Sequence, residues 1–381
     1  MKLFIASGIF HPEPGGPATY LRELLPELIA RGWDTRVLTF SDSPHTDLRY
    51  PYPVTRILRR SLPVRMIDYA RAARPLLAWA DVVYLHTLGL PLYGDQHAPR
   101  IVKIVGDPAW ERSVRKGWLP PGEDIDAFQT KTYSDPRIVL DRWRRASEAR
   151  SLDAVIVPSE YLKRMVVGWG VDAAKVRVIY NALPPDTVAT TLTQAEARAQ
   201  LGWSAAPTIL TVGRLLPWKG VDHLITALHR LPDLRLVVAG DGDILDGLKA
   251  QAADLGDRVI FAGRVSREQM PIYMKAADYL ALYSGYEGLS HTLLESLRVG
   301  TPVIASDKGG NPEVVRHNVN GLLVPYVNVD ALTAALETAF RPGLRDSLAA
   351  NSTVGMERFA FARMIEATAA ALMSAASITE K

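Results

Sequence analysis

The feature that most limits the possible folds is a repeated order of short apolar segment, glycine loop and amphipathic helix. At the start, Lys2–Ser7 is largely apolar, and residues 11–16 form a loop rich in proline and glycine. An amphipathic stretch, 18–31, follows and closes at Gly32 before the next apolar segment, Asp34–Phe40. Strand, loop, helix and strand in this order form the unit of a parallel sheet covered by helices. The sequence therefore predicts an α/β fold.

The pattern runs through the chain twice. In the first half, further strands are predicted at Asp81–His86, Arg100–Val105, Asp153–Pro158 and Val176–Tyr180, whereas residues 44–64 read as an irregular excursion. The second run begins near Pro207, with strands predicted at Thr208–Val212, Leu234–Ala239, Val259–Ala262, Tyr279–Tyr283 and Pro302–Ser306. A length of 381 residues suits two domains, and the Pro-Pro pair within 181–186 suits a stiff linker. We expect two doubly wound parallel-sheet domains, 1–185 and 186–358, and a closing helical segment, 359–381.

Composition excludes several classes of protein. There are no cysteines, so disulfides, thiolate metal sites and cysteine nucleophiles are excluded. No apolar run reaches membrane-spanning length, and the first residues read as a strand, not a signal peptide. Residues 1–185 hold 26 Lys+Arg and 20 Asp+Glu (+6), and the rest hold 18 and 21 (−3). This uneven distribution of charge indicates an anionic partner or surface for the first half. The excess of Lys and Arg is too small to be typical of a nucleic-acid-binding protein.

Six arginines between Arg56 and Arg74 face a single acid, Asp68, with apolar residues among them. Two interpretations are open. The stretch can rest on anionic lipid, or it can be a solvated helix face. The first would place a cytoplasmic protein on the inner face of the cell membrane.

The glycines near the start do not form a dinucleotide fingerprint, because Gly-x-Gly-x-x-Gly is absent. This disfavours an oxidoreductase. Gly15 and Gly16 still permit close approach of the backbone to a phosphate, since neither has a side chain, and the alternative is a plain tight turn.

The stretch 285–295 has the strongest chemical pattern. Glu287 lies in a glycine loop, Ser290 is a candidate N-cap, and Glu295 lies one turn inside the helix that follows. A helix start attracts anions, and the two carboxylates can hold hydroxyls on either side of a phosphate. A nucleotide-sugar presents those groups in that order. The alternative is a capped surface helix with solvated glutamates.

Two cations are predicted at the same sheet edge, because the loops that follow parallel strands open on one side. Arg214 and Lys219 share the loop 213–220, and other glycine loops follow at 240–242, 263–265 and 309–313. An arginine fork and a mobile lysine charge can neutralise a diphosphate leaving group without a metal.

At this point the sequence resembles the retaining nucleotide-sugar glycosyltransferases of family 4, which have the two-domain GT-B fold. The resemblance spans nearly the whole chain. It rests on Pro14-Gly15-Gly16, Val178-Ile-Tyr-Asn-Ala, Val212-Gly-Arg-Leu with Lys219-Gly220, Ala239-Gly-Asp-Gly242, Gly263-Arg-Val265, Glu287 to Glu295, and Gly300-Thr-Pro-Val-Ile-Ala-Ser with Gly309-Gly310 and Pro312-Glu313.

The resemblance implies a role for each matching residue. Arg214 and Lys219 resemble the pair that binds the donor diphosphate, Glu287 the glutamate that holds donor sugar hydroxyls, and Glu295 the glutamate that holds the ribose. Ser290, His291 and Thr292 would offer backbone amides to the phosphates, Arg264 and Val265 would border the base, and Gly16 would approach the diphosphate across a cleft. The last helix would return to the first domain.

One position departs from the family. Many members end the strand that corresponds to Arg100–Val105 with a histidine facing the donor sugar, whereas this chain has Gly106 and then Asp107. Asp107, or His86 on the neighbouring predicted strand, would take over that role. With Trp110, these two residues are the candidates for the acceptor side. The alternative for Asp107 is a helix cap before Pro108.

The implied reaction moves a hexose-type sugar from a UDP- or GDP-sugar to a hydroxyl of a glycan, glycolipid or small molecule, with retained configuration and no required cofactor or metal. Double displacement needs a carboxylate nucleophile, for which Glu287 and Asp107 are candidates. Front-face departure and attack is the other route. The alternatives outside this class are an epimerase of the same architecture and a non-catalytic nucleotide-sugar binding protein.

Overall fold

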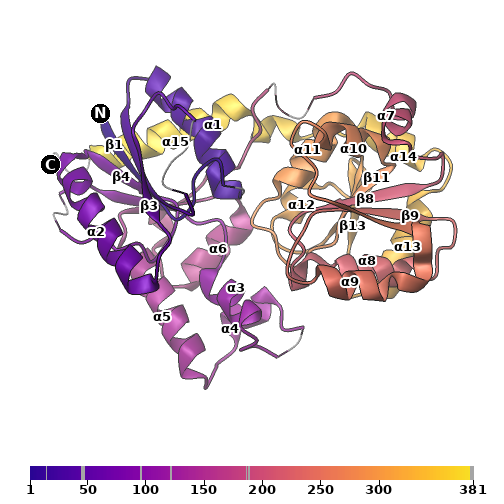
Figure 1. Cartoon of the computed structure of the whole chain (residues 1–381), viewed down its shortest axis with the longest axis horizontal. Coiled ribbons are helices and arrows are strands. Elements are labelled where there is room, and N and C mark those ends of the chain that lie inside the picture. The colour runs from indigo at the N-terminus through magenta and orange to yellow at the C-terminus, as the bar shows by residue number, and fades with distance from the viewer. Residues whose placement is uncertain are drawn as a thin grey trace. The chain divides into compact units, whose positions relative to one another are not determined.

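The computed structural model describes residues 1–13, 15–43, 48–94, 97–120, 122–185, 187 and 189–377. Pro14 and Asp186, which belong to two of the motifs above, lie outside these residues. The chain forms two compact units (Figure 1). Unit 1 comprises Met1–Asn181 with Phe361–Lys381, and unit 2 comprises Ala182–Ala360. The sequence predicts the corresponding boundaries at 185 and 358. In the described part of the chain, no helix has the length and apolar character needed to cross a bilayer.

Unit 1 is built on a seven-stranded parallel sheet with the order β3-β2-β1-β4-β5-β6-β7. Its central strands are buried along most of their length, as expected for a parallel sheet covered on both faces. The strands are β1 (Lys2–Ser7), β2 (Asp34–Ser41), β3 (Val54–Leu58), β4 (Val82–Leu85), β5 (Arg100–Lys103), β6 (Ala154–Val157) and β7 (Val176–Val178).

Two expectations for this sheet were wrong. The stretch 44–64 is not irregular throughout, because Val54–Leu58 forms edge strand β3. An edge strand pairs with only one neighbour, and β3 is short and only partly buried, so the apolar pattern that marks a strand is weak in this part of the sequence. Strand β5 ends at Lys103, two residues before the predicted end, and the chain continues as a loop into helix α3 (Pro108–Arg115).

The helices of unit 1 lie on both faces of this sheet (Figure 1). Right-handed crossovers place the connections β3 to β4 and β5 to β6 on one face, because both run in the same direction across the sheet, and the connection β1 to β2 on the other. The helices are α1 (Gly16–Ala30), α2 (Leu62–Trp79), α3, α4 (Ile125–Thr130), α5 (Pro136–Ser151), α6 (Glu160–Gly168), the short 3₁₀ helix η1 (Ala173–Lys175) and the last helix, α15 (Phe361–Ala376).

The last helix belongs to unit 1 by its contacts. It packs against α1 and β4. Tyr20 of α1 is buried there, and its hydroxyl lies 3.3 Å from that of Thr368 on α15. A segment at the end of the chain thus completes the core of the first unit.

Unit 2 has a six-stranded parallel sheet with the order β10-β9-β8-β11-β12-β13. Its core is made of leucine, isoleucine, valine and tyrosine side chains from the sheet and from the helices α8 and α13, which pack together on one face. The strands are β8 (Thr208–Val212), β9 (Arg235–Ala239), β10 (Val259–Gly263), β11 (Tyr279–Leu282), β12 (Val303–Ser306) and β13 (Gly321–Val324).

The helices of unit 2 begin mostly at the loops that follow these strands. A capping box between Thr193 and Glu196 starts the first of them, α7. They are α7 (Gln194–Leu201), η2 (Pro217–Lys219), α8 (Val221–Leu228), α9 (Leu245–Gln251), η3 (Ala253–Arg258), α10 (Met270–Ala276), α11 (His291–Val299), α12 (Asn311–Val314), α13 (Val329–Ala339), α14 (Leu344–Ala350) and η4 (Met356–Phe359).

Candidate functional site

The loops after the strands of unit 2 meet at the carboxyl edge of its sheet, because all six strands are parallel. Among them are the loops after β8, β9, β10, β11 and β12, which carry the residues predicted to bind a nucleotide-sugar donor. The contacts among these loops decide which of those residues can act together.

The structure brings Lys219 and Glu287 into direct contact. The Lys219 ammonium donates to a Glu287 carboxylate oxygen at 2.6 Å, and both side chains are largely buried. Gly220 makes this approach possible. It has φ +67°, and a Cβ at that position would lie 1.9 Å from the Tyr283 carbonyl oxygen at the end of β11. The loop that carries Lys219 can therefore lie directly on the start of the loop that carries Glu287.

The loop that carries Glu287 is held from its other side by two glycines. The backbone N–H of Gly310 donates to the Glu287 carbonyl at 2.8 Å. Gly309 has φ +63°, and a Cβ there would lie 2.3 Å from the same carbonyl oxygen. These contacts fix the backbone of Glu287 between the loops that follow β8 and β12, so the carboxylate is positioned before any ligand arrives.

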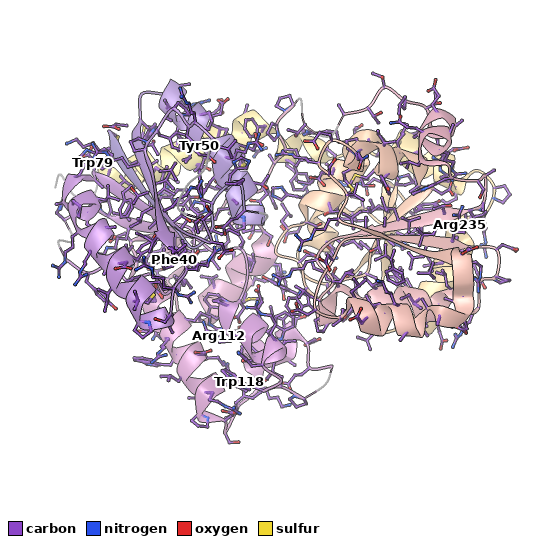
Figure 2. All side chains as sticks on the ribbon, in the orientation of Figure 1. Phe40, Tyr50, Trp79, Arg112, Trp118 and Arg235 are labelled. Carbon is purple, nitrogen blue, oxygen red and sulfur yellow. The ribbon has the colours of Figure 1, made fainter. Side chains whose placement is uncertain are left out.

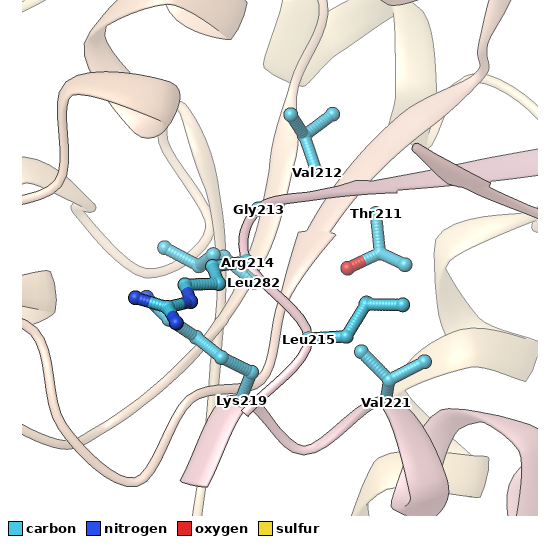
Figure 3. A pocket seen from close by; sticks show the side chains of 8 residues that line it. All are labelled: Thr211, Val212, Gly213, Arg214, Leu215, Lys219, Val221 and Leu282. Atoms are coloured by element: carbon cyan, nitrogen blue, oxygen red, sulfur yellow. The ribbon is translucent and has the colours of Figure 1, made fainter. Parts of the chain in front are cut away.

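Arg214 lines one pocket with Lys219 (Figure 3). Its side chain is exposed, and its carboxylate neighbour, Asp243, is 4.0 Å away. The rest of the pocket wall is mainly apolar and comes from β8, its loop, the start of α8 and β11. Two cations at the mouth of one pocket form an attractive place for a diphosphate.

Helix α11 begins next to Glu287 as the sequence predicts. Ser290 is its N-cap and accepts the Leu293 N–H at 3.3 Å. His291 and Thr292 are the first two helical residues. The N–H groups of a first turn have no acceptor within the helix, and they give this end a partial positive charge. The glycine loop and the helix start therefore present positive potential on the same side as Lys219.

Glu295 lies farther along α11, partly buried. Burial raises the pKa of its carboxyl to about 7, and the nearby cations Arg267 and Arg298 act in the opposite direction. Functional sites often contain a carboxyl group whose pKa is shifted toward neutrality, as here near the carboxyl edge of the sheet of unit 2. Arg298 itself donates to the carbonyls of Leu183 and Thr187.

Arg264 and Val265 follow β10, on the far side of the loop after β9. Arg264 forms an ion pair with Asp241 at 3.1 Å, and both side chains are well exposed. Asp241 also caps the N–H of Gly242. The sequence did not lead us to predict Asp241 as a partner of Arg264, although an acidic residue between two glycines after a strand was a usable signal. Among the described residues, no group of three or more His, Asp and Glu side chains is arranged to hold a metal.

The remaining predicted residues belong to unit 1. Gly16 is exposed as the first residue of α1. Trp110 is buried in α3. His86 is buried after β4, with its ring 4.3 Å from that of Tyr84 and 5.5 Å from that of Tyr20. Burial, with a smaller effect of Lys103, lowers the pKa of His86 well below its ordinary value.

Asp107 is fully buried, and both of its oxygens have partners inside unit 1. One oxygen accepts the N–H groups of Ala109 and Trp110 at 3.0 and 3.2 Å, which makes Asp107 the N-cap of α3. The other accepts from Gln129 at 2.8 Å and from the buried guanidinium of Arg145. These contacts agree with the interpretation of Asp107 as a helix cap. The catalytic role of Asp107 stays a prediction.

The comparisons with known proteins cover both units. Residues 14–187 match the family model described as Glycosyltransferase Family 4, and residues 193–353 match the model described as Glycosyl transferases group 1. The chain is 30% identical over 230 residues to an uncharacterized glycosyltransferase of Methanocaldococcus jannaschii, with 58% of this chain and 59% of that protein covered.

A second relative is a GDP-mannose-dependent alpha-(1-6)-phosphatidylinositol monomannoside mannosyltransferase of Mycobacterium tuberculosis, 36% identical over 156 residues. That match covers 38% of this chain and 40% of the relative. The chain therefore matches less than two thirds of the length of these curated relatives.

An Anabaena protein solved in complex with UDP-glucose has a similar structure. The TM-score is 0.77 at 21% identity, with 98% of this chain and all of that chain covered. At this identity the likeness concerns the fold. Two Rossmann-like units with parallel sheets of seven and six strands make up the GT-B architecture, and the predicted fold class is confirmed.

Proposed function

The chain belongs to the glycosyltransferases of family 4, and on that premise we propose that it moves a hexose-type sugar from a UDP- or GDP-sugar to an acceptor hydroxyl, with retention. The observation that carries this proposal is the contact between Lys219 and Glu287 beside Arg214, at the edge where α11 begins. A glycan or lipid-linked acceptor is proposed because relatives act on such molecules by name.

In this proposal, Arg214 and Lys219 bind the donor diphosphate, and the first turn of α11 from Ser290 to Thr292 adds backbone N–H groups. Glu287 holds hydroxyls of the donor sugar. Before the donor binds, the Lys219 ammonium balances the charge of the Glu287 carboxylate. Glu295 holds the ribose hydroxyls. Arg264 and Val265 border the base.

We propose the front-face route for the chemistry. A carboxylate held by an ammonium at 2.6 Å is a poorer nucleophile than a free one, so Glu287 suits hydroxyl binding better than covalent attack. The bond from the anomeric carbon to the diphosphate oxygen breaks, and the acceptor oxygen bonds to the same face of that carbon. The acceptor proton passes to the departing diphosphate, whose charge Arg214 and Lys219 stabilise.

The reaction should not need a divalent metal, because two cations and a helix start already oppose the diphosphate charge. A panel of UDP- and GDP-sugars is first ranked by the rise in unfolding temperature that each causes. Hydrolysis and transfer with the best donor are then measured in excess chelator. Unchanged rates are expected. Activity that vanishes and returns only with magnesium or manganese would contradict this site, and a donor that is epimerised without an acceptor would contradict transfer.

Donor affinity should rise with pH around neutrality. The pKa of Glu295 is about 7, so its carboxylate, which accepts the ribose hydroxyls, forms as the pH increases through that value. The dissociation constant of an intact nucleotide-sugar, whose diphosphate does not titrate here, should fall between about pH 6 and pH 8 and then level off. Titration calorimetry measures it.

Two variants distinguish the role proposed for Glu287 from the role proposed for Glu295. Glu295→Gln should weaken donor binding at pH 8 by about 1.5–3 kcal/mol and remove the pH dependence. Glu287→Gln should keep the pH dependence and lower turnover more than it lowers nucleotide affinity. Equal effects of both variants on the affinity for free nucleoside diphosphate would refute the division of roles.

A further inference from the structure

Helix α5 of unit 1 buries two charged residues and exposes three large apolar ones. Asp141 and Arg145 are buried, together with Ile138 and Ala149. Val139, Leu140 and Trp143 are exposed, at 48%, 42% and 60%. Helices on the surface of a soluble domain normally have the opposite arrangement. The apolar residues are spaced at i, i+1 and i+4, so they form one continuous patch over the first two turns.

The buried charges of α5 have partners inside the unit. Asp141 accepts two hydrogen bonds of 2.9 Å from Arg112 on α3. Arg145 pairs with Asp107, and its guanidinium lies over the ring of Trp169, 4.1 Å from the centroid. These contacts account for the inner side. Packing within the described chain does not account for the outer side, where a large aromatic residue and two aliphatic residues face solvent.

Three ion pairs of α5 and of the segment before it expose their cations and hide their carboxylates. Side-chain exposure is 53% for Arg112 against 9% for Asp141, 53% for Lys131 against 6% for Glu123, and 59% for Arg137 against 24% for Asp135. By contrast, the pair Arg230–Asp330 in unit 2 exposes its carboxylate by 85%. The segment around α5 therefore presents positive charge although its cations are paired, and Arg144 adds another exposed cation beside Trp143.

The first two turns of α5, which carry the patch, lie toward the carboxyl edge of the sheet in unit 1, and the course of the helix can be followed in Figure 1. Helix α5 ends at Ser151, immediately before β6 begins at Ala154, so its last turn is at the amino edge. Sixteen residues of helix span about 24 Å, which carries the first turns to the opposite edge. Arg112 and Trp118, labelled in Figure 2, lie at this same end of the unit.

We propose that the outer face of α5, defined by Val139, Leu140 and Trp143, docks on an anionic lipid bilayer. Tryptophan with flanking arginines suits the boundary between acyl chains and phosphate groups, because the indole enters the apolar layer while each guanidinium binds phosphate. The outward cations favour this occupant over a protein surface, since they match a uniformly negative plane. The inference concerns binding to a surface and does not depend on the transfer reaction.

The arginines between 56 and 74 are a weaker candidate for the same role. Arg59 of that stretch pairs with Glu13 and Asp42, and Arg56 donates to the carbonyl of His11. Helix α2 does expose Leu62 and Ile67, at 59% and 52%. It therefore supplies a matched control, with two exposed apolar residues on a helix that covers the same face of the sheet.

The full chain is tested by flotation with vesicles of phosphatidylcholine alone and with about a third of phosphatidylglycerol, at low and high salt. The chain should partition onto the anionic vesicles and be released by high salt. The double variant Leu140→Ser/Trp143→Ser should lose about tenfold in partitioning, since it removes most of the apolar anchor. The control Leu62→Ser/Ile67→Ser should bind like the parent chain. Unfolding curves verify that both variants fold.

Three results would overturn the proposal. The first is equal partitioning onto both kinds of vesicle, or onto neither. The second is binding that the α5 variant keeps and the α2 variant loses. The third is a drop in the mass of the free chain, measured by sedimentation equilibrium, when the α5 residues are replaced, because the patch would then join copies of the protein.

Discussion

Replacing Asp107 by asparagine should lower the free energy of unfolding by about 3–5 kcal/mol, because it removes the only carboxylate paired with the buried guanidinium of Arg145 among the described contacts. Asparagine keeps an oxygen for the N-cap of α3, so the cap itself is retained. The –NH₂ group of asparagine, however, would face the N–H donors of Arg145 and Gln129, from which it cannot accept a hydrogen bond. Denaturant unfolding of parent and variant measures the loss.

A matched control lies on the same helices. Asp141 pairs with Arg112, whose side chain is 53% exposed and can regain water when the pair is broken. Asp141→Asn should therefore cost no more than about 1 kcal/mol. The double variant Asp107→Asn/Arg145→Met should recover part of the lost stability, since no unpaired charge stays buried. Equal losses for Asp107→Asn and Asp141→Asn would contradict the argument.

The same variant tests the catalytic role predicted for Asp107. If this carboxylate acted on the sugar, Asp107→Asn would unfold normally and lose turnover by a factor of about a hundred. The structure leads us to expect the reverse, a less stable protein whose turnover at low temperature is close to that of the parent chain. Transfer rates measured well below the unfolding temperature separate the two outcomes.

Replacing Lys219 by methionine should lower turnover by a factor of about 10²–10³, because it removes a positioned cation from the departing diphosphate. The change also leaves the Glu287 carboxylate without its partner, next to the negative charge of the donor. Single-turnover measurements at saturating donor report the chemical step. Lys249→Met, at an exposed position of α9, is the matched control and should have no effect.

A double variant distinguishes charge stabilisation from a role in holding the loop. If Lys219 acted only by restraining Glu287, the double variant Lys219→Met/Glu287→Gln would turn over no more slowly than Glu287→Gln alone. If Lys219 acts on the diphosphate, the double variant should be slower than either single variant. A single variant within about threefold of the parent rate would contradict both interpretations.

The candidate donor site could be predicted largely from the sequence because it is made of local patterns. Ser290 as N-cap of α11, Glu287 in the preceding glycine loop and the loops after parallel strands each follow from a few neighbouring residues. The contact between Lys219 and Glu287 spans 68 residues, yet parallel topology alone brings their two loops to one edge. The missed partner Asp241 also lay in a local pattern.

In unit 1 the sequence determined less. It identified Asp107 correctly as the residue that precedes a helix, although β5 ends earlier, at Lys103, and both a cap and a catalytic carboxylate fit that position. The choice depends on Arg145, 38 residues away on α5, which no pattern around Asp107 reveals. Likewise, no pattern in the arginine-rich sequence of α5 shows that Asp141 and Arg145 are buried.

The sequence by itself determined the two parallel-sheet units, the loops at the carboxyl edge of unit 2 and the chemistry of the residues on them, because periodicity, caps and glycines act over a few residues. The tertiary structure alone decided which charges are buried and which apolar residues are left outside. Burial depends on segments far apart in the chain, such as α15 against α1 and α3 against α5. Arg145 can be buried because Asp107, which is distant in the sequence, pairs with it.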